Sequence, residues 1–165
     1  MNSEQLQWKL VHFDRMTADE LYEALMLRQR VFVVEQQCAF LEADGVDPYA
    51  WHLFGSLPVE VENIQPLLAA YLRIVPPGRR FEEPSIGRVV TAPEVRRKGL
   101  GRALMQEGIR RTRELYPGQA IKLSAQRYLE GFYGSLGFII NGEPYEEDGI
   151  PHINMVMAQK VVSSQ

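Results

Sequence analysis

Cysteine is almost absent from this chain of 165 residues, in which Cys38 is the single example. One thiol cannot form an intrachain disulfide and cannot supply the ligands of a cysteine-based metal cluster, so we expect no metal site. A reducing compartment, the cytoplasm by default, fits this composition. Because no activating group lies near Cys38 in the sequence, we interpret it as a small buried or loop residue and not as a nucleophile.

Long apolar runs and an excess of positive charge are also missing. No stretch approaches the roughly 20 apolar residues that span a bilayer, and the polar segment 1–7 has no apolar signal core. With 18 basic and 21 acidic residues, the formal net charge of -3 gives no general attraction for nucleic acid or an anionic membrane. The chain has no internal repeat, and its length suits one domain over 1–165 with a core from about 6 to 158.

The chain does contain a local concentration of glycine and positive charge. Segment 96–101 has the sequence Arg-Arg-Lys-Gly-Leu-Gly and follows an apolar run that ends at Val90. Segment 96–114 contains seven basic residues and only two acidic ones. Glycines let a ligand approach the backbone closely, and a helix start supplies free N–H groups at a positive dipole end. We therefore predict a pyrophosphate cradle, which suits an anionic cofactor.

Two other phosphate-binding patterns are excluded by their spacing. A dinucleotide fingerprint requires a small residue three places after its second glycine, where this chain has Leu104. A P-loop requires two glycines five residues apart followed by lysine and serine or threonine, and no segment has this pattern. The interpretation that is left is a strand-to-helix turn whose successive amides face an anion. Such a basic turn can also be ordinary solvated surface, and its arginines alone would support nucleic-acid binding.

Hydrophobic periodicity predicts strands and helices in alternation. Thr17, with Glu20 three residues later, indicates a capping box, and the helix that starts there is predicted to run to about residue 33. Arg28 and Glu35 are expected near the apolar edge of this helix. Further helices are expected at 100–115 and 128–136, and strands at 8–13, 51–57, 67–75, 85–91, 121–125, 138–141 and 152–157. This order indicates a mixed α/β layer fold, with a hairpin across the polar segment 58–66.

Two segments, 38–50 and 142–151, are predicted to be loops. The first contains Glu42, Asp44 and Asp47. These carboxylates would attract a cationic amine or belong to an ordinary solvated turn. Because loops usually build acceptor pockets, we expect 36–50 and 142–151 to shape one here.

The predicted cradle resembles a motif of a known family. Arg96, Gly99 and Gly101 fit the pattern of arginine or glutamine, two residues, glycine, one residue, and glycine or alanine. This is motif A of the GNAT acetyltransferase superfamily. Segment 132–138, Phe-Tyr-Gly-Ser-Leu-Gly-Phe, resembles motif B of that superfamily, with Phe132 in place of the usual leucine. On these motifs the chain is identified as a member.

The resemblance covers about 85–138, and segments 28–36 and 142–152 are similar to the bacterial ElaA-type subgroup. It implies the GNAT fold, a mixed and mostly antiparallel central sheet with flanking helices and a splayed strand pair that binds coenzyme A. It also implies transfer of an acetyl group from acetyl-CoA to a primary amine of a small molecule or peptide, by direct attack on the thioester. The alternative is a non-catalytic acyl-CoA-binding regulatory module of the same fold. A monomer and a homodimer are both compatible with the sequence.

Family roles can be carried over by motif position. The turn into the helix is expected to hold the pyrophosphate, and strand 85–91 to pair with the pantetheine arm. The cofactor-binding residues are then Val89, Val90, Thr91, Arg96, Arg97, Lys98, Gly99, Leu100, Gly101 and Arg102. Gln126 occupies the place of a family asparagine that bonds the pantetheine arm, and a helix cap is its alternative role. A backbone N–H near Val90 is expected to stabilise negative charge on the thioester oxygen.

The same resemblance assigns proton transfers. Tyr133 matches the family tyrosine that protonates the departing thiolate, for which a phenol with a pKa of about 10 is suited. Ordinary core packing of its ring is the alternative. A general base would help the reaction, because an amine with a pKa of about 10.4 is mostly protonated at neutral pH. The candidates are Glu35 and His152, with His52 a weaker one and water-mediated proton removal a further route.

Overall fold

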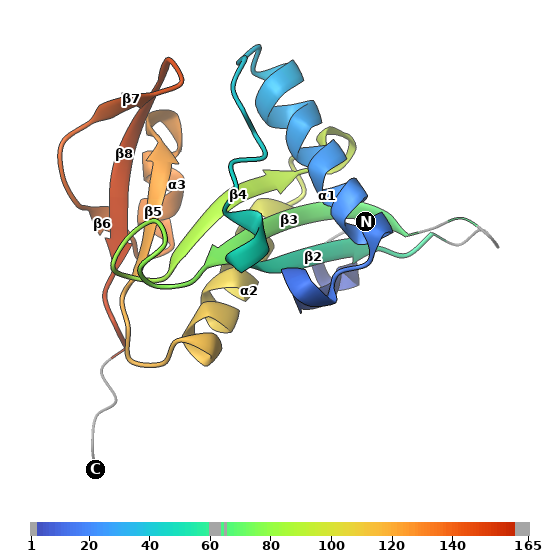
Figure 1. Cartoon of the computed structure of the whole chain (residues 1–165), viewed down its shortest axis with the longest axis horizontal. Coiled ribbons are helices and arrows are strands. Elements are labelled where there is room, and N and C mark those ends of the chain that lie inside the picture. The colour runs from blue at the N-terminus through green and yellow to red at the C-terminus, as the bar shows by residue number, and fades with distance from the viewer. Residues whose placement is uncertain (1–2, 60–63, 65, 161–165) are drawn as a thin grey trace.

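A twisted sheet runs through the computed structural model, which describes residues 3–59, 64 and 66–160 (Figure 1). Its 8 strands follow the order β1-β2-β3-β4-β5-β8-β6, and β7 pairs with β8. Neighbours are antiparallel except for β4 and β5. The strands are β1 Gln7–His12, β2 Trp51–Leu57, β3 Leu67–Val75, β4 Ser85–Thr91, β5 Ile121–Gln126, β6 Ile139–Ile140, β7 Tyr145–Glu147 and β8 Ile150–Met157. The predicted mixed, mostly antiparallel sheet and its hairpin of β2 and β3 are confirmed.

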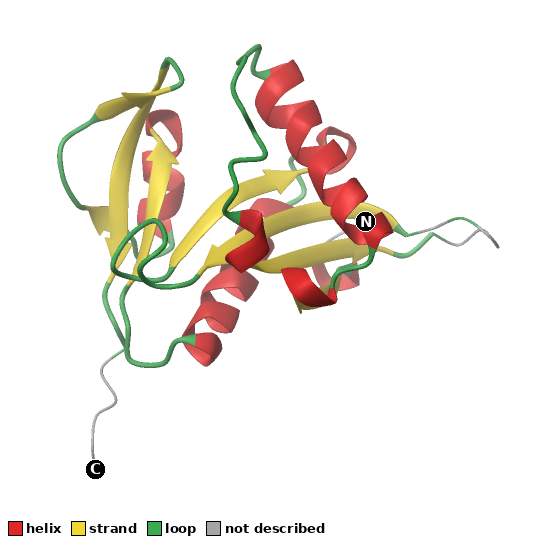
Figure 2. Ribbon diagram, in the orientation of Figure 1, coloured by secondary structure: helices red, strands yellow, loops and turns green. Residues whose placement is uncertain are grey.

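Helices pack on both faces of the sheet (Figure 2). The α-helices are α1 Ala18–Gln29, α2 Leu100–Leu115 and α3 Glu130–Ser135, and short turns lie at Ser3–Gln5, Phe13–Arg15, Asp47–Tyr49, Pro93–Val95 and Arg127–Leu129. Alternate side chains of β3 point into two separate hydrophobic cores, one on each face of the sheet. Ala69 and Tyr71 pack with α1, whereas Ala70 and Leu72 pack with α2, as the period of two along a strand requires. The central strand is therefore buried on both faces.

The first helix begins as predicted, but its hydrogen bonding changes from α to π before its predicted end. The Thr17 hydroxyl accepts a hydrogen bond from the Glu20 amide, and the Glu20 carboxylate accepts one from the Thr17 amide, each at 3.1 Å. Regular α-helix ends at Gln29 and continues as a π-helix over Arg30–Glu35. The prediction that Arg28 lies at the apolar edge is wrong. Its side chain is fully buried because carboxylates of the following loop pair with it.

Strands β4 and β5 diverge from one point of contact (Figure 1). Within the described residues, Ser85 and Lys122 form the single register pair between them. The pairing of β4 with β3 is irregular between Tyr71 and Arg73, and Arg88 opposite has a φ of 52°. An extra residue and a left-handed φ at a non-glycine position are marks of a β-bulge. The predicted splayed strand pair is therefore present.

The C-terminal part contains a strand that the sequence did not predict. β7 forms a hairpin with β8, and Tyr145 lies opposite His152. The expected loop 142–151 is therefore partly a hairpin, because pairing with β8 orders a segment too short and acidic to show apolar alternation. In the expected connection 58–66, residues 60–63 and 65 lie outside the described part of the chain, as do residues 1–2 of the polar N-terminal segment.

Candidate active site

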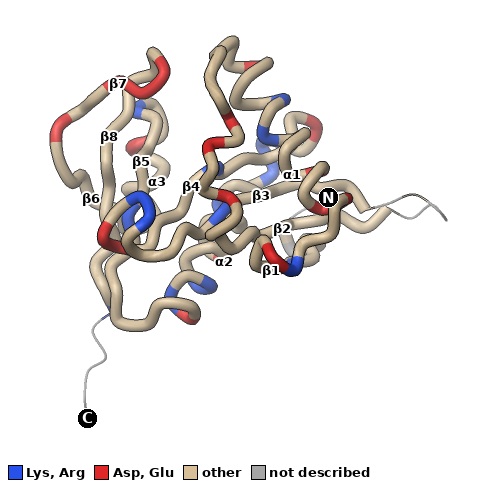
Figure 3. The backbone as a smooth tube through the Cα atoms, in the orientation of Figure 1, with Lys and Arg blue, Asp and Glu red and all other residues tan. Residues whose placement is uncertain are grey.

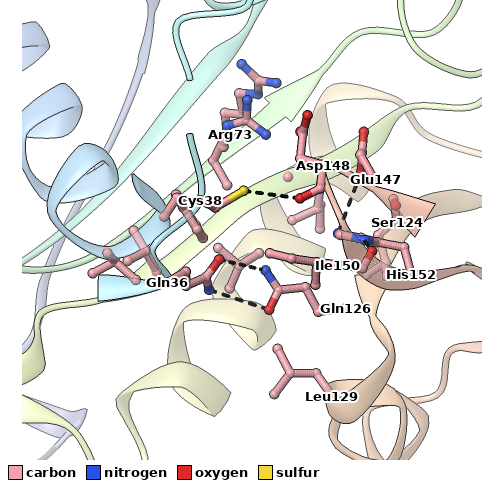
Figure 4. Close-up of a pocket in the computed structure, with 18 of the residues that line it drawn as sticks. Gln36, Cys38, Arg73, Ser124, Gln126, Leu129, Glu147, Asp148, Ile150 and His152 are labelled. Atoms are coloured by element: carbon pink, nitrogen blue, oxygen red, sulfur yellow. Dashed lines mark hydrogen bonds and ion pairs between the residues drawn. The ribbon is translucent and has the colours of Figure 1, made fainter. Parts of the chain in front are cut away.

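The divergence of β4 and β5 leaves a cavity of about 530 Å³ (Figure 4). Its walls come from β4, β5, the π-helix, α3 and the hairpin of β7 and β8. Both segments expected to shape an acceptor pocket, 36–50 and 142–151, contribute residues to it. The cavity therefore brings the sequence motifs and the loops together.

The turn that precedes α2 has the backbone of an anion cradle. Arg97 and Gly99 have left-handed φ values of 66° and 73°, and such residues turn successive N–H groups to one side. A Cβ atom at Gly101 would meet only Phe132 Cζ of the surrounding protein, at 4.0 Å, so packing does not require glycine there. Glycine instead leaves the backbone accessible at the start of the helix. The residues present therefore fit the pyrophosphate of a CoA derivative.

Much of the positive charge in α2 is already paired within the protein. Arg110 and Arg111 form ion pairs with Glu107 at 2.6 and 2.8 Å. Arg102 donates a hydrogen bond to the Ser135 hydroxyl at 2.7 Å. In the exposed turn before the helix, Arg96 pairs with Glu35, whereas Arg97 and Lys98 have no ion pair among the described residues and can face an anion.

Glu35, a predicted base, lies at the cavity with a partner already in place. Its carboxylate accepts a hydrogen bond from Arg96 at 2.6 Å, and the two side chains are 42% and 38% exposed. The pair joins the end of the π-helix to the turn before α2. Proton removal by Glu35 would compete with this ion pair, so the geometry favours a linking role.

Tyr133 of α3 lines the cavity and is only 6% exposed. Its ring contacts Phe132 and Phe138, with centroid distances of 5.2 and 6.2 Å. Burial, together with the nearby Tyr128, raises the pKa of Tyr133. Its hydroxyl has no hydrogen-bond partner among the described residues. This position is compatible with both predicted roles, core packing of the ring and proton donation by the hydroxyl.

His152 lies on β8 beside Gln126 of β5 and faces the cavity (Figure 4). Its Nδ1 atom is 2.7 Å from the Ile150 carbonyl oxygen, which can only accept, so Nδ1 carries the proton. In the neutral tautomer Nε2 then carries the lone pair, and Nε2 lies 3.7 Å from a carboxylate oxygen of Glu147. The ring also stacks on Tyr145 at a centroid distance of 5.9 Å. An imidazole oriented in this way beside a carboxylate can serve as a proton acceptor through Nε2.

His52 lies apart from the cavity and is fully buried. Its Nε2 is 3.0 Å from the Asp47 carbonyl oxygen, so Nε2 carries the proton and Nδ1 accepts a hydrogen bond from the Tyr71 hydroxyl at 2.6 Å. Burial lowers the pKa of His52, against the opposing effect of Asp47. Because both ring nitrogens are engaged inside the protein, His52 is not retained as a candidate base.

Two contacts cross the cavity between the segment after α1 and the C-terminal strands (Figure 4). Gln36 and Gln126 exchange hydrogen bonds between their side-chain amides, at 3.2 and 3.5 Å. The Cys38 thiol donates to the Asp148 carbonyl oxygen at 3.3 Å. Cys38 is buried, as predicted, and Gln126 projects from the end of β5 toward the opposite wall.

The acidic loop is bound to the rest of the protein by ion pairs, and both interpretations of it are wrong for Glu42 and Asp47. These two residues are buried, with 7% and 6% exposure, whereas the Asp44 side chain is 25% exposed and lines the cavity. All three pair with arginines of α1, β3 and β4, namely Arg28, Arg73 and Arg88. Figure 3 shows the acidic and basic positions along the backbone around these elements. Burial opposes ionisation of Asp44, but Arg73 and Arg88 outweigh it and lower its pKa. Buried carboxylates need such partners, because an unpaired buried charge is costly.

Arg73 and Arg88 line the cavity and were not among the predicted site residues. A signal for them exists in the sequence, since each is the single charged residue of its strand, Leu67–Val75 and Ser85–Thr91. Arginine is rarely buried without a partner. An arginine inside a buried strand therefore predicts a carboxylate or a ligand next to it, but the sequence does not say which.

Comparison with known proteins identifies the family. A model of the acetyltransferase (GNAT) domain matches residues 67–159, more than half of the chain. The chain therefore belongs to the GNAT acetyltransferase family and has the acyl-CoA N-acyltransferase fold. It is 41% identical over 152 residues to a UPF0039 protein of Synechocystis sp., covering 92% of this chain and 95% of that protein. It is 36% identical over 161 residues to ElaA of Escherichia coli, covering 96% and 99%.

Solved structures agree with this assignment. An acyl-CoA N-acyltransferase from Pseudomonas aeruginosa is 39% identical, with a TM-score of 0.83 and coverage of 93% of this chain and 99% of that chain. The crystal structure of Escherichia coli ElaA gives a TM-score of 0.80 at 35% identity, with coverage of 92% and 99%. The resemblance to the family and to ElaA is confirmed. Of the helices in the described residues, none has the length and apolar character to span a membrane.

Proposed function

We propose that this protein transfers an acetyl group from acetyl-CoA to a primary amine of a small molecule or peptide, by direct attack of the amine on the thioester. The observation that carries the proposal is the cavity between β4 and β5, with Tyr133, His152 and Arg96 on its wall. Family membership supports the class of reaction, acyl transfer from a CoA derivative. When bound, acetyl-CoA supplies the activated acyl group.

The residues that would bind the donor come from two elements. The turn at 96–102 would hold the pyrophosphate through its amides and positive charge. Beyond Ser85 the described part of β4 has no register pair with β5, so Val89, Val90 and Thr91 are free to pair with the pantetheine arm as a strand would. A backbone N–H near Val90 would donate to the thioester oxygen.

The proton transfers are assigned to two side chains. His152 is the proposed base, with Nε2 as the acceptor and Glu147 stabilising the imidazolium that forms. Tyr133 is the proposed acid toward the thiolate, because its raised pKa keeps the phenol protonated and its hydroxyl has no competing partner among the described residues. Glu35 is the alternative base, and the ion pair with Arg96 argues against it.

Release of CoA thiol with a panel of primary amines tests the proposal. We expect thiol release that depends on both the amine and acetyl-CoA, with longer acyl-CoA donors run in parallel to test the acetyl preference. A non-catalytic acyl-CoA-binding module would show a higher melting temperature with acetyl-CoA and no thiol release with any amine. That result would replace the proposed activity with a binding function.

A further inference from the structure

Three guanidinium groups and three carboxylates meet where segment 36–47 crosses β3 and β4. This arginine cluster consists of Arg28, Arg73, Arg88, Glu42, Asp44 and Asp47. Its formal charges cancel, so net charge does not indicate a ligand. Its hydrogen-bond donors and acceptors are less evenly matched than its charges, because a guanidinium has five N–H donors and no acceptor.

Arg28 uses all of its nitrogens inside the protein. Nε donates to a Glu42 carboxylate oxygen at 2.7 Å, and Nη1 donates to Asp47 at 2.8 Å and to the Tyr71 hydroxyl at 3.4 Å. Nη2 donates to the other Asp47 oxygen at 3.1 Å and to the Glu42 carbonyl at 3.4 Å. Arg28 is fully buried and does not line the cavity. Its role is structural.

Arg88 and Arg73 keep unused donors at the cavity wall. Arg88 donates from Nε to Glu42 at 2.7 Å and from Nη2 to the Glu42 carbonyl and to Asp44 at 3.0 and 3.3 Å, while Nη1 has no partner in the described chain. The Arg88 side chain is 17% exposed. Behind it, the Arg73 side chain is 1% exposed, and its Nε is a buried atom without a hydrogen bond in the described part of the chain. Both residues line the cavity, and Figure 4 shows Arg73 at its wall.

No carboxylate of the cluster is available to complement these donors. Of the three, Asp44 alone lines the cavity, and both of its oxygens already accept hydrogen bonds from Arg73. The other carboxylates at the cavity, Glu35, Glu147 and Asp148, lie on the π-helix and the β7–β8 hairpin. Glu147 there lies beside His152, the proposed base. The two walls of the cavity thus differ. The unused donors of Arg73 and Arg88 lie on β3 and β4, whereas His152 lies on β8 beside Glu147, whose carboxylate also pairs with Arg80 at 3.1 Å.

We propose that the acceptor is an amine that also bears a carboxylate, as a free amino acid does, and that Arg88, supported by Arg73, binds that carboxylate. The inference rests on the proposed function and narrows its acceptor class. An arginine N–H paired with a carboxylate is a strong, charge-assisted hydrogen bond, and the partly buried site strengthens it. The amine of the same molecule then lies on the side of His152. An N-terminal amine of a long peptide would not bring a carboxylate to this position.

Matched acceptors test the inference with the wild-type protein. Each common amino acid is compared with its carboxamide and its decarboxylated amine in the thiol-release assay, at equal concentration of neutral amine. We expect at least one amino acid to exceed its carboxamide by about 10- to 100-fold in kcat/KM, the range for losing a hydrogen bond to a charged group. Carboxamides that react as well as the acids would overturn the inference and leave the proposed function intact.

Arg88→Gln tests the assigned residue, with Arg79→Gln as the matched control. Arg79 is exposed, stacks on Tyr49 and does not line the cavity. We expect Arg88→Gln to raise KM for the amino acid about 10- to 100-fold and to remove the preference for the amino acid over its carboxamide. Arg79→Gln should change none of these. An unchanged KM for the amino acid in a folded Arg88→Gln protein would overturn the assignment.

The two proposals fail in different ways. Absence of thiol release with every amine would overturn the proposed function and this inference with it. Thiol release without preference for carboxylates would overturn the inference alone. If circular dichroism shows that Arg88→Gln does not fold, the matched acceptors on the wild-type protein decide the question by themselves.

Discussion

The ring of Tyr133 belongs to the core, while its hydroxyl has no hydrogen bond among the described residues. Buried phenols usually find a partner, so a free hydroxyl at a cavity suits a group that bonds a ligand. Tyr133→Phe removes that oxygen and keeps the ring. We expect kcat in the thiol-release assay to fall about 10²- to 10⁴-fold, with little change in acetyl-CoA affinity measured by calorimetry. Unchanged turnover would leave Tyr133 with packing as its role.

The raised pKa of Tyr133 leads to a prediction for kcat at alkaline pH. The protonated phenol is the active form, and burial with Tyr128 nearby raises its pKa above the ordinary value of about 10. We therefore expect kcat, measured at saturating substrates, to show no decline from Tyr133 as the pH rises to about 10. A descending limb below about pH 9 that disappears in Tyr133→Phe would contradict the assignment.

The choice between His152 and Glu35 as the base can be made with two conservative variants. His152→Asn keeps an N–H that can donate to the Ile150 carbonyl and removes Nε2. We expect it to lower kcat about 10²- to 10⁴-fold, and Glu35→Gln to have a much smaller effect on kcat, because the Glu35 carboxylate is paired with Arg96. Steady-state kinetics with both substrates varied measures both effects. The reverse order of effects would identify Glu35 as the base.

At the scale of elements, the approach of α2 to the sheet depends on Gly108. A Cβ atom there would lie 2.6 Å from a methyl carbon of Leu72, which is itself fully buried in β3. We expect Gly108→Val to lower the free energy of unfolding by about 1 to 3 kcal/mol through overpacking. Urea unfolding measures this. The control Gln106→Val, at an exposed position of the same helix, should cost under about 1 kcal/mol through helix propensity alone.

Element boundaries followed from the sequence where local signals were strong. The bounds of β2, β3, β4 and α2 match the prediction, because prolines, glycines and a clear apolar period mark their ends. The π-helix after Gln29 and strand β7 did not follow from it. The first continues a helical pattern with a different hydrogen-bond spacing, and the second depends on pairing with β8. Neither property is encoded in local periodicity.

At the scale of the whole molecule, the arginine cluster ties α1, the acidic loop, β3 and β4 together. Burial opposes ionisation of Asp47, but Arg28 and Arg73 outweigh it and lower its pKa. An Asp with a lowered pKa in the folded state contributes stability above its unfolded pKa of about 3.9 and loses that contribution as the pH falls further. We therefore expect the free energy of unfolding to drop below about pH 4.

Asp47→Asn tests the origin of this acid sensitivity. The substitution leaves the charges of buried Arg28 and Arg73 without full compensation. We therefore expect the free energy of unfolding to fall by about 3 kcal/mol at pH 7 and to decline less steeply toward acid pH than in the wild type. Urea unfolding at a series of pH values from about 3 to 7 measures both. An acid decline of the same steepness in the variant would show that other carboxylates cause it.

The sequence by itself determined the family, the strand-to-helix turn at 96–101 and the position of Tyr133 in its motif, because each depends on residue types at fixed spacing along the chain. The tertiary structure decided what lies across the cavity. It buried His52, paired Glu35 with Arg96 and brought His152 to the wall opposite β4. It also turned an acidic loop into the partner of buried arginines. These outcomes depend on contacts between residues far apart in the chain, and such contacts leave no local pattern to find.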